Sequence, residues 1–186
     1  MTPSLQGKLL VATPALEDPN FKQTVVLLIQ AAEEGVIGLI LNRVSDKRIS
    51  DLWDTIFPES DHTSASQHIN LGGPVFGPLM LLHTRKELSD LEILPGLYFA
   101  TQKEYLEEII NNDIQPYRLY LGHSGWGQGQ LQREITEGAW FIVPASVRYA
   151  FDQENDIWRI GLHVAGYNAL VKVLGRHDFP EDPTLN

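Results

Sequence analysis

The chain contains no cysteine, which excludes disulfide bonds, thiol nucleophiles and thiolate metal sites. It also has no apolar run that approaches the roughly 20 residues of a membrane-spanning helix. The longest apolar runs, such as residues 25–29, are far shorter than that. Residues 1–8 lack the basic start and apolar core of an export signal. The lack of an export signal and of a membrane span predicts a cytoplasmic protein with no membrane association.

Basic residues are scarce, with 14 Lys and Arg against 24 Asp and Glu and a net charge of −10. Nucleic-acid affinity depends largely on cations that neutralise phosphates, and the chain has no run of five or more basic residues. We therefore expect the acidity to serve solubility and expect no direct binding of DNA or RNA. A local basic patch at Arg43, Lys47 and Arg48 is the one feature that would favour nucleic-acid binding.

Motifs for metals and cofactors are also missing. The six histidines, at positions 62, 68, 83, 123, 163 and 177, show neither H-x-x-x-H nor H-E-x-x-H spacing. The chain has no G-x-x-x-x-G-K-[ST] phosphate loop and no G-x-G-x-x-G followed by an acidic residue about 20 positions later. The sequence therefore predicts no metal and no cofactor.

The apolar pattern that is present predicts an α+β fold with a mostly antiparallel sheet. Strands are expected at 8–12, 24–30, 36–42, 69–71, 79–83, 96–100, 119–121 and 139–143. Helices are expected from Ser50, after Thr101 with Glu104 completing a capping box, from Gln130, from Ser146, and in a final region that breaks near Gly166. Residues 85–95 are interpreted as an acidic connection. We expect one domain over residues 1–175 and a flexible tail at 176–186.

Residues 118–135 are the most unusual stretch, and they predict a short strand, a loop with four glycines around Trp126, and a helix start. The first interpretation is a turn whose glycines let Trp126 pack against the sheet. A second is an anion site at the start of the helix. A third is a serine nucleophile, because residues 122–126 partly match G-x-S-x-G, although Trp126 stands where the last glycine belongs.

Several short segments, in order and at compatible spacing, resemble the YqgE/AlgH family of bacterial proteins. They are residues 7–14, 18–21, 38–43, 72–75, 82–83, 96–98, 122–134 and Trp140. The resemblance covers the chain from about Leu5 to Leu174. It implies an α+β domain of coiled, branching, mostly antiparallel β-sheet with short helices packed on it. The family's members are described as uncharacterised or as transcriptional regulators. The chain departs from the family pattern at His123, Ser124 and Gln128, where Tyr, Ala, and Pro or Ala are common.

Polar and glycine residues near predicted strand ends form the site hypothesis. The candidate ligand- or partner-binding residues are Asp18, Asn20, Asn42, Arg43, His83, Gly125, Trp126 and Gly127. No residue is assigned a catalytic role. The leading hypothesis is a non-enzymatic binding or regulatory module that recognises a protein partner or a small anionic ligand through the glycine-rich loop and the adjacent polar edge. The alternative is an enzyme or binder that acts on a phosphorylated or carboxylated small molecule in the same cleft. Direct regulation by nucleic-acid binding is a third hypothesis.

Overall fold

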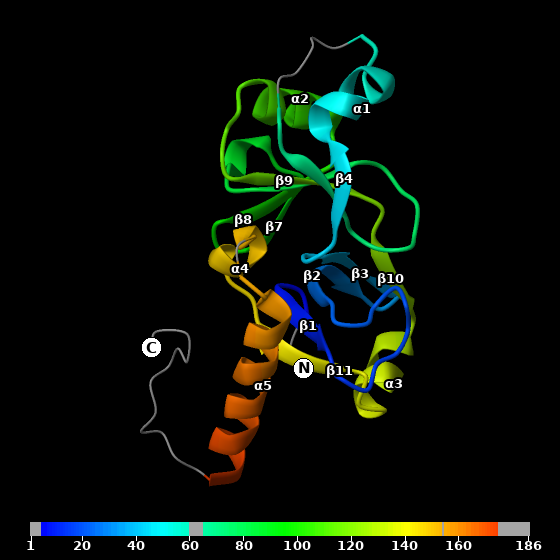
Figure 1. Cartoon of the computed structure of the whole chain (residues 1–186), viewed down its shortest axis with the longest axis vertical. Helices are drawn as coiled ribbons and strands as arrows, with labels where there is room; N and C mark the ends of the chain where they lie inside the picture. The colour runs from blue at the N-terminus through cyan, green and yellow to red at the C-terminus, as the bar shows by residue number, and fades with distance from the viewer. Residues whose placement is uncertain (1–4, 60–64, 154, 175–186) are drawn as a thin grey trace.

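The computed structural model describes residues 5–59, 65–153 and 155–174. Their elements form two β-sheets with helices packed against them, and Figure 1 shows the smaller sheet in the lower half and the larger one above it. The mixture of mainly antiparallel sheet and helices confirms the predicted α+β class. None of the described helices is long and apolar enough to span a membrane.

The first sheet is fully antiparallel and has the strand order β10-β3-β2-β1-β11. Its strands are β1 (Lys8–Ala12), β2 (Val25–Ala32), β3 (Gly35–Ile40), β10 (Ser124–Gly127) and β11 (Trp140–Pro144). Side chains alternate between two cores, which explains why β2 is apolar without interruption. The strand order places the β2–β3 hairpin inside the sheet.

The second sheet has the order β4-β5-β9-β6-β8-β7. It consists of β4 (Val44–Arg48), β5 (His68–Leu71), β6 (Met80–His83), β7 (Leu91–Leu94), β8 (Leu97–Ala100) and β9 (Tyr117–Leu121). All neighbours are antiparallel except β5 and β9, which run parallel. After β9 the chain passes to β10 of the first sheet, whereas after β5 it returns to β6 of the second.

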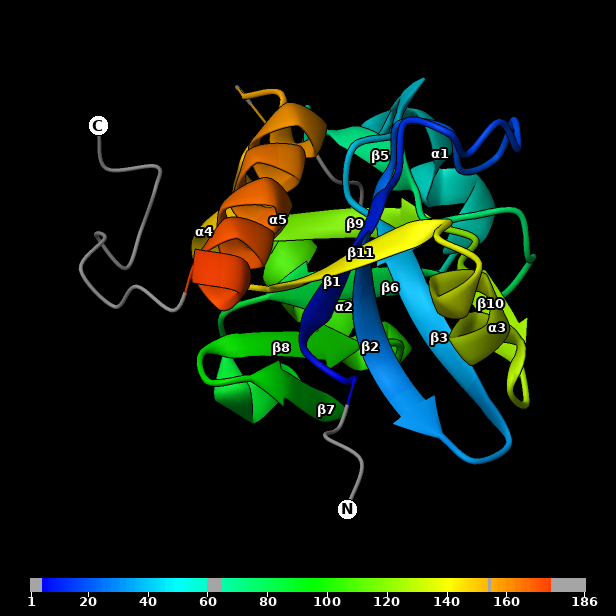
Figure 2. The ribbon, with the colours of Figure 1, turned by 90° about the horizontal axis from the view of Figure 1, so that it is seen from below.

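Three apolar clusters hold the sheets and helices together. Helices α1 (Ile49–Ile56) and α2 (Lys103–Asn111) cover the outer face of the second sheet. Helix α3 (Gln130–Thr136) covers the outer face of the first sheet, while α4 (Val147–Phe151) and α5 (Ile157–Leu174) pack against the core between the sheets. Figure 2 shows α3 and α5 on opposite sides of the first sheet's strands. The short helix η1 spans Lys86–Leu88.

A buried arginine links these layers. The guanidinium of Arg118 on β9 donates to the Leu41 carbonyl at 2.7 Å, the Asn70 Oδ1 at 2.6 Å and the Ala150 carbonyl at 3.0 Å. These acceptors lie just after β3, on β5 and on α4, so one side chain joins both sheets and a helix. Because Arg118 is 2% exposed, these hydrogen bonds replace the lost hydration of its two terminal nitrogens, while its buried Nε has no hydrogen-bond partner in the described chain.

Three predictions about elements were wrong. The glycine-rich segment contains the strand β10, because Ser124 and Trp126 pair with β3 despite the weak strand propensity of glycine. Residues 85–95 are more than a connection, since they include η1 and β7. Helix α5 continues through Gly166 without a break. The glycine that matters for packing there is Gly161, where a Cβ would lie 2.7 Å from the Val11 side chain.

Two predicted helix caps were also wrong. Helix α1 is capped at Arg48 rather than Ser50, with the Asp51 carboxylate accepting from the Arg48 amide at 2.9 Å. The N-cap of α2 is Gln102, because the Thr101 hydroxyl donates to Asp90 at 2.9 Å instead of serving a capping box. The predicted cap at Ser146 is confirmed. The expected tail at 176–186 lies outside the described residues.

Candidate functional site

The geometry of the site begins where two glycine-containing segments cross. The turn at 72–75, which follows β5, lies against residues 122–124, which follow β9. A Cβ added to Gly72 would lie 2.3 Å from the Gly122 carbonyl oxygen, and one added to Gly73 would lie 2.4 Å from the His123 backbone. Glycine is therefore required at this crossing for close approach of two backbones.

Strand β10 begins at this crossing and is anchored by Trp126. The Trp126 indole is buried and donates to Glu134 Oε2 at 2.9 Å, while the Trp140 indole donates to the same oxygen at 2.8 Å. Phe21 stacks on Trp126 with ring centroids 5.9 Å apart. The geometry agrees with the first interpretation of the glycine-rich stretch, in which Trp126 packs against the sheet. Glu134 was not identified from the sequence as the acceptor for the two indoles. The one feature of the sequence that could have indicated this role is its position one turn after the start of α3.

The outer edge of β10 carries backbone groups that face away from β3. His123 exchanges both of its backbone hydrogen bonds with Val75 at 2.9 Å, on the side opposite β3. Since these groups alternate along a strand, Gly125 and Gly127 face the same outer side. The Gly127 amide is bonded to Gln130 Oε1 at 3.1 Å. The Gly125 amide and carbonyl have no hydrogen-bond partner within the described part of the chain.

An open groove of about 480 Å³ lies beside this edge and crosses the ends of β10, β3 and β2, because its lining also includes Gln30 and Ala32 of β2. Its lining includes Val75, Gly125 and Gly127, together with Ile37 on β3 and Glu34 in the hairpin turn. A Cβ on Gly125 would meet nothing closer than 3.7 Å, and a Cβ on Gly127 nothing closer than 3.9 Å. Packing therefore does not require glycine at either of these two positions.

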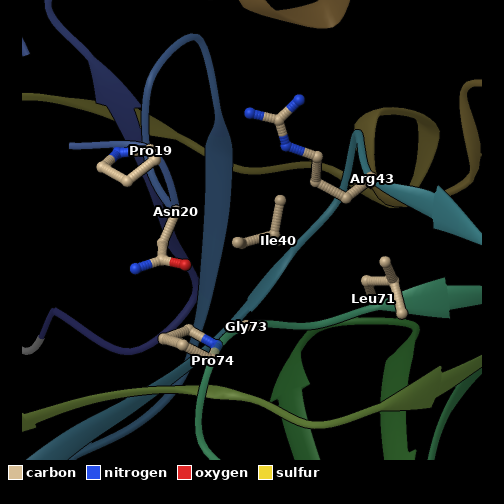
Figure 3. A pocket seen from close by; sticks show the side chains of 7 residues that line it. All are labelled: Pro19, Asn20, Ile40, Arg43, Leu71, Gly73 and Pro74. Atoms are coloured by element: carbon tan, nitrogen blue, oxygen red, sulfur yellow. The ribbon is translucent and has the colours of Figure 1, made fainter. Parts of the chain in front are cut away.

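A second concave surface, a pocket of about 210 Å³, lies on the other side of the 72–75 turn. Figure 3 shows Asn20 and Arg43 extending from opposite sides of the pocket with Ile40 between them. The remaining lining residues are Pro19, Leu71, Gly73 and Pro74. The candidate residues included Asn20 and Arg43 but none of the apolar residues that line the pocket. The Gly73-Pro74 turn is the sequence feature that could have indicated them.

Asp18 and Asn42 support this pocket from outside it. The Asp18 carboxylate accepts from the Asn20 amide at 2.8 Å, which folds the 18–21 loop onto itself. The Asn42 side chain accepts from the Val25 amide at 3.0 Å and donates to the Gln23 carbonyl at 2.8 Å. Both side chains therefore position the loop that brings Asn20 opposite Arg43.

His83 lies apart from these residues, on β6 in the second sheet, and it is fully buried. Its Nδ1 accepts from the Arg85 amide at 3.2 Å. Burial lowers the pKa of His83 to about 4, although the nearby Asp90 and Glu87 carboxylates oppose that shift. The eight candidate residues thus do not share one cleft: Asn20 and Arg43 line the pocket, the three residues of β10 line the groove, and His83 lines neither.

The geometry at Ser124 is not that of an activated nucleophile. Ser124 is fully buried, and its hydroxyl donates to the Gly72 carbonyl at 3.1 Å rather than to an imidazole. Within the described ranges, no three His, Asp or Glu side chains are grouped so that they could hold a metal ion. Positions His62 and His177 lie outside those ranges.

The predicted basic patch is interrupted by acids. Lys47 and Arg48 are exposed on β4, where Asp46 precedes them. The carboxylate of Asp51 lies against the Arg48 backbone amide. Arg43 points to a different neighbour, since its Nη2 donates to the Lys22 carbonyl at 2.8 Å. Arg43 is thus bound to a loop carbonyl, while Lys47 and Arg48 are exposed on β4 next to Asp46.

Comparison with known proteins shows related chains of similar length. A UPF0301 protein of Chlorobaculum tepidum is 38% identical over 80% of this chain and 79% of its own length. A UPF0301 protein of Chlamydia abortus is 36% identical over 97% of this chain and 95% of its own. The solution structure of the AlgH protein from Pseudomonas aeruginosa matches with a TM-score of 0.72 and 28% identity, covering 97% of this chain and 98% of that protein.

A crystal structure of protein DIP2367 from Corynebacterium diphtheriae shares the fold with a TM-score of 0.66 and 25% identity, covering 84% of this chain and 85% of that one. Residues 9–169 also match the family described as AlgH-like, DUF179. The match spans β1 to most of α5 and agrees with the motifs noted in the sequence. The chain therefore belongs to the AlgH-like family, the YqgE/AlgH family that those motifs indicated.

Proposed function

We propose that this protein is a non-enzymatic binding module that recognises an extended segment of a partner protein along the outer edge of β10. Strand addition of this kind obtains affinity from backbone hydrogen bonds and specificity from alternate side chains. The proposal refines the broader hypothesis of a binding or regulatory module with a glycine-rich recognition element.

The observation that carries the proposal is the pair of glycines on β10. Gly72 and Gly73 are required by close packing, but Gly125 and Gly127 have room for a side chain. The absence of a side chain at Gly125 instead leaves its outward backbone groups accessible to another strand, whereas the Gly127 amide is already bonded to Gln130 Oε1. Natural proteins usually block such edges with charge, proline or a covering loop, and the 72–75 turn covers this one only as far as His123.

The groove also indicates the chemistry of the partner. Its apolar contacts come from Ile37 and Val75, and Phe76 beside Val75 is 94% exposed. Its one charged lining side chain is Glu34, in a chain with a net charge of −10. A complementary segment would be extended, with apolar side chains toward Ile37 and Val75 and a Lys or Arg near Glu34.

The test is a selection of displayed peptides on the intact protein, followed by measurement of affinity for two matched variants. Gly125→Pro removes the outward amide and leaves the pairing of Ser124 and Trp126 with β3 in place, whereas Gly125→Ala retains the amide. We expect Gly125→Pro to weaken binding at least about tenfold, through the lost hydrogen bond and the clash of its ring with the incoming strand. Gly125→Ala should stay within about threefold.

Two results would refute strand addition at this edge. One is a set of selected peptides that bind Gly125→Pro as well as the parent protein. The other is failure to select any peptide above background while amide spectra show that β10 is formed. Backbone amide shifts in the Gly125→Pro variant, confined to β10 and its neighbours, would establish that the variant is folded.

A further inference from the structure

We infer that the pocket between Asn20 and Arg43 is a separate site for a small monocarboxylate with a short hydrocarbon tail. It lies across the 72–75 turn from the β10 groove, with Gly73 and Pro74 lining the pocket and Val75 lining the groove. The inference therefore goes beyond the proposed strand addition and can fail or succeed independently of it.

The cation of the site is held in place without being neutralised. The Nη2 of Arg43 donates to the Lys22 carbonyl at 2.8 Å, which fixes the guanidinium plane. No carboxylate within the described ranges comes close enough to Arg43 for an ion pair. The other N–H groups of this fork are available to a ligand, and a guanidinium fork matches the two oxygens of a carboxylate.

The opposite side of the pocket supplies a neutral hydrogen-bonding group. Asn20 lines the side of the pocket opposite Arg43, with its side chain directed toward Pro74 in Figure 3, and its side-chain amide has no hydrogen-bond partner within the described chain. The nearest acid on this loop, Asp18, is turned back by its 2.8 Å hydrogen bond to the Asn20 backbone amide. Asn20 can therefore donate to a carboxylate oxygen without competition from Asp18.

The rest of the lining limits the ligand class. Ile40, Leu71 and the rings of Pro19 and Pro74 form an apolar surface that suits a hydrocarbon tail. Only one cation lines the pocket, so a phosphate dianion would keep part of its charge unpaired. A volume of about 210 Å³ restricts the ligand to a few carbon atoms. These three limits favour a short monocarboxylate over a sugar phosphate or a nucleotide.

The test is an NMR titration of the intact protein with isovalerate and with isovaleramide, which has the same shape without the charge, at constant ionic strength. We expect isovalerate to give saturable shifts of the Asn20 side-chain amide and the Arg43 Nε–H, with a Kd of about 1 mM, as for a fragment-sized ligand. The amide should bind at least about tenfold more weakly, because the guanidinium is then left without an anion.

Two variants and one further ligand complete the test. Arg43→Gln should abolish the isovalerate shifts, while Arg148→Gln, on the exposed surface of α4, should leave them unchanged. If isovaleramide binds as tightly as isovalerate, the pocket recognises only the hydrocarbon part of the ligand, and the inference is overturned. Isovalerate shifts that persist in Arg43→Gln, tighter binding of inorganic phosphate than of isovalerate, or no saturable shift up to about 50 mM would also overturn it.

Discussion

Replacement of Glu134 by alanine tests the anchor that holds β10 in the sheet. The Oε2 atom of Glu134 accepts hydrogen bonds from the Trp126 and Trp140 indoles, at 2.9 and 2.8 Å, and its Oε1 accepts from Gln130 at 2.9 Å. Both tryptophans are 3% exposed, so their N–H groups have little access to water. The substitution would leave two buried donors without an acceptor.

The expected loss follows from those two donors. A buried polar group left unsatisfied costs about 1–3 kcal/mol, and partial entry of water at the half-buried Glu134 reduces the sum to about 2–4 kcal/mol. For a chain of 186 residues, each kcal/mol lowers Tm by about 2–4 °C. Glu134→Gln retains an oxygen that can accept from both indoles, so we expect about half of the effect.

The assay is urea unfolding followed both by tryptophan fluorescence and by circular dichroism, because coincidence of the two transitions supports two-state analysis. Glu137→Ala, an exposed acid after the same helix, is the matched control and should change stability by less than about 0.5 kcal/mol. If Glu134→Ala is no more destabilising than this control, the shared carboxylate does not anchor β10 and the argument for a fixed recognition edge loses its support.

Three further substitutions test other parts of the structure. Arg118→Met should destabilise the fold by about 3–5 kcal/mol in denaturant titrations, since it removes a buried group that three acceptors from different layers require; a loss below about 1 kcal/mol would contradict the linking role. Gly73→Ala should cost about 1–3 kcal/mol or more, because its φ is +150° and its Cβ would lie 2.4 Å from the backbone, whereas Gly125→Ala should be nearly neutral; similar losses would refute the distinction between the two glycines. The pKa of His83, about 4 when folded against 6.5 unfolded, means that only the unfolded chain gains this proton as pH falls from 6.5 to 4. Folding stability should therefore decrease over that range by up to about 3 kcal/mol from this group, and His83→Gln should flatten the stability–pH curve there; an unchanged curve would contradict the assignment.

The sequence predicted the central strands well because their apolar residues satisfy the burial pattern directly. β1, β2 and β3 are apolar on both faces, and the structure covers both faces. The strands that escaped prediction are edge or near-edge segments. β4 has four polar residues out of five and is mostly exposed, and β10 has two glycines. Both segments have low strand propensity and become strands because they pair with a neighbouring strand of the sheet.

The site was predictable only where neighbours in sequence determine neighbours in space. Asn42 and Arg43 follow β3, and their hydrogen bonds to Gln23 and Lys22 bring the 18–21 loop beside them. His83 was grouped with them because it also ends a strand. Strand order places β6 in the other sheet, and no single-sequence pattern specifies which strands become neighbours.

The crossing of the two glycine segments determines how the pocket and the groove relate. The 72–75 turn forms a wall of both, yet a Cβ on Gly72 or Gly73 would lie 2.3–2.5 Å from the neighbouring backbone. This close packing leaves Gly72 and Gly73 little freedom to move, although Pro74 and Val75 in the same turn are exposed. A preformed surface avoids much of the ordering cost of binding. It also transmits little between its two sides, because coupling requires an element with two alternative arrangements. From this packing we expect the two proposed occupants to bind without affecting each other.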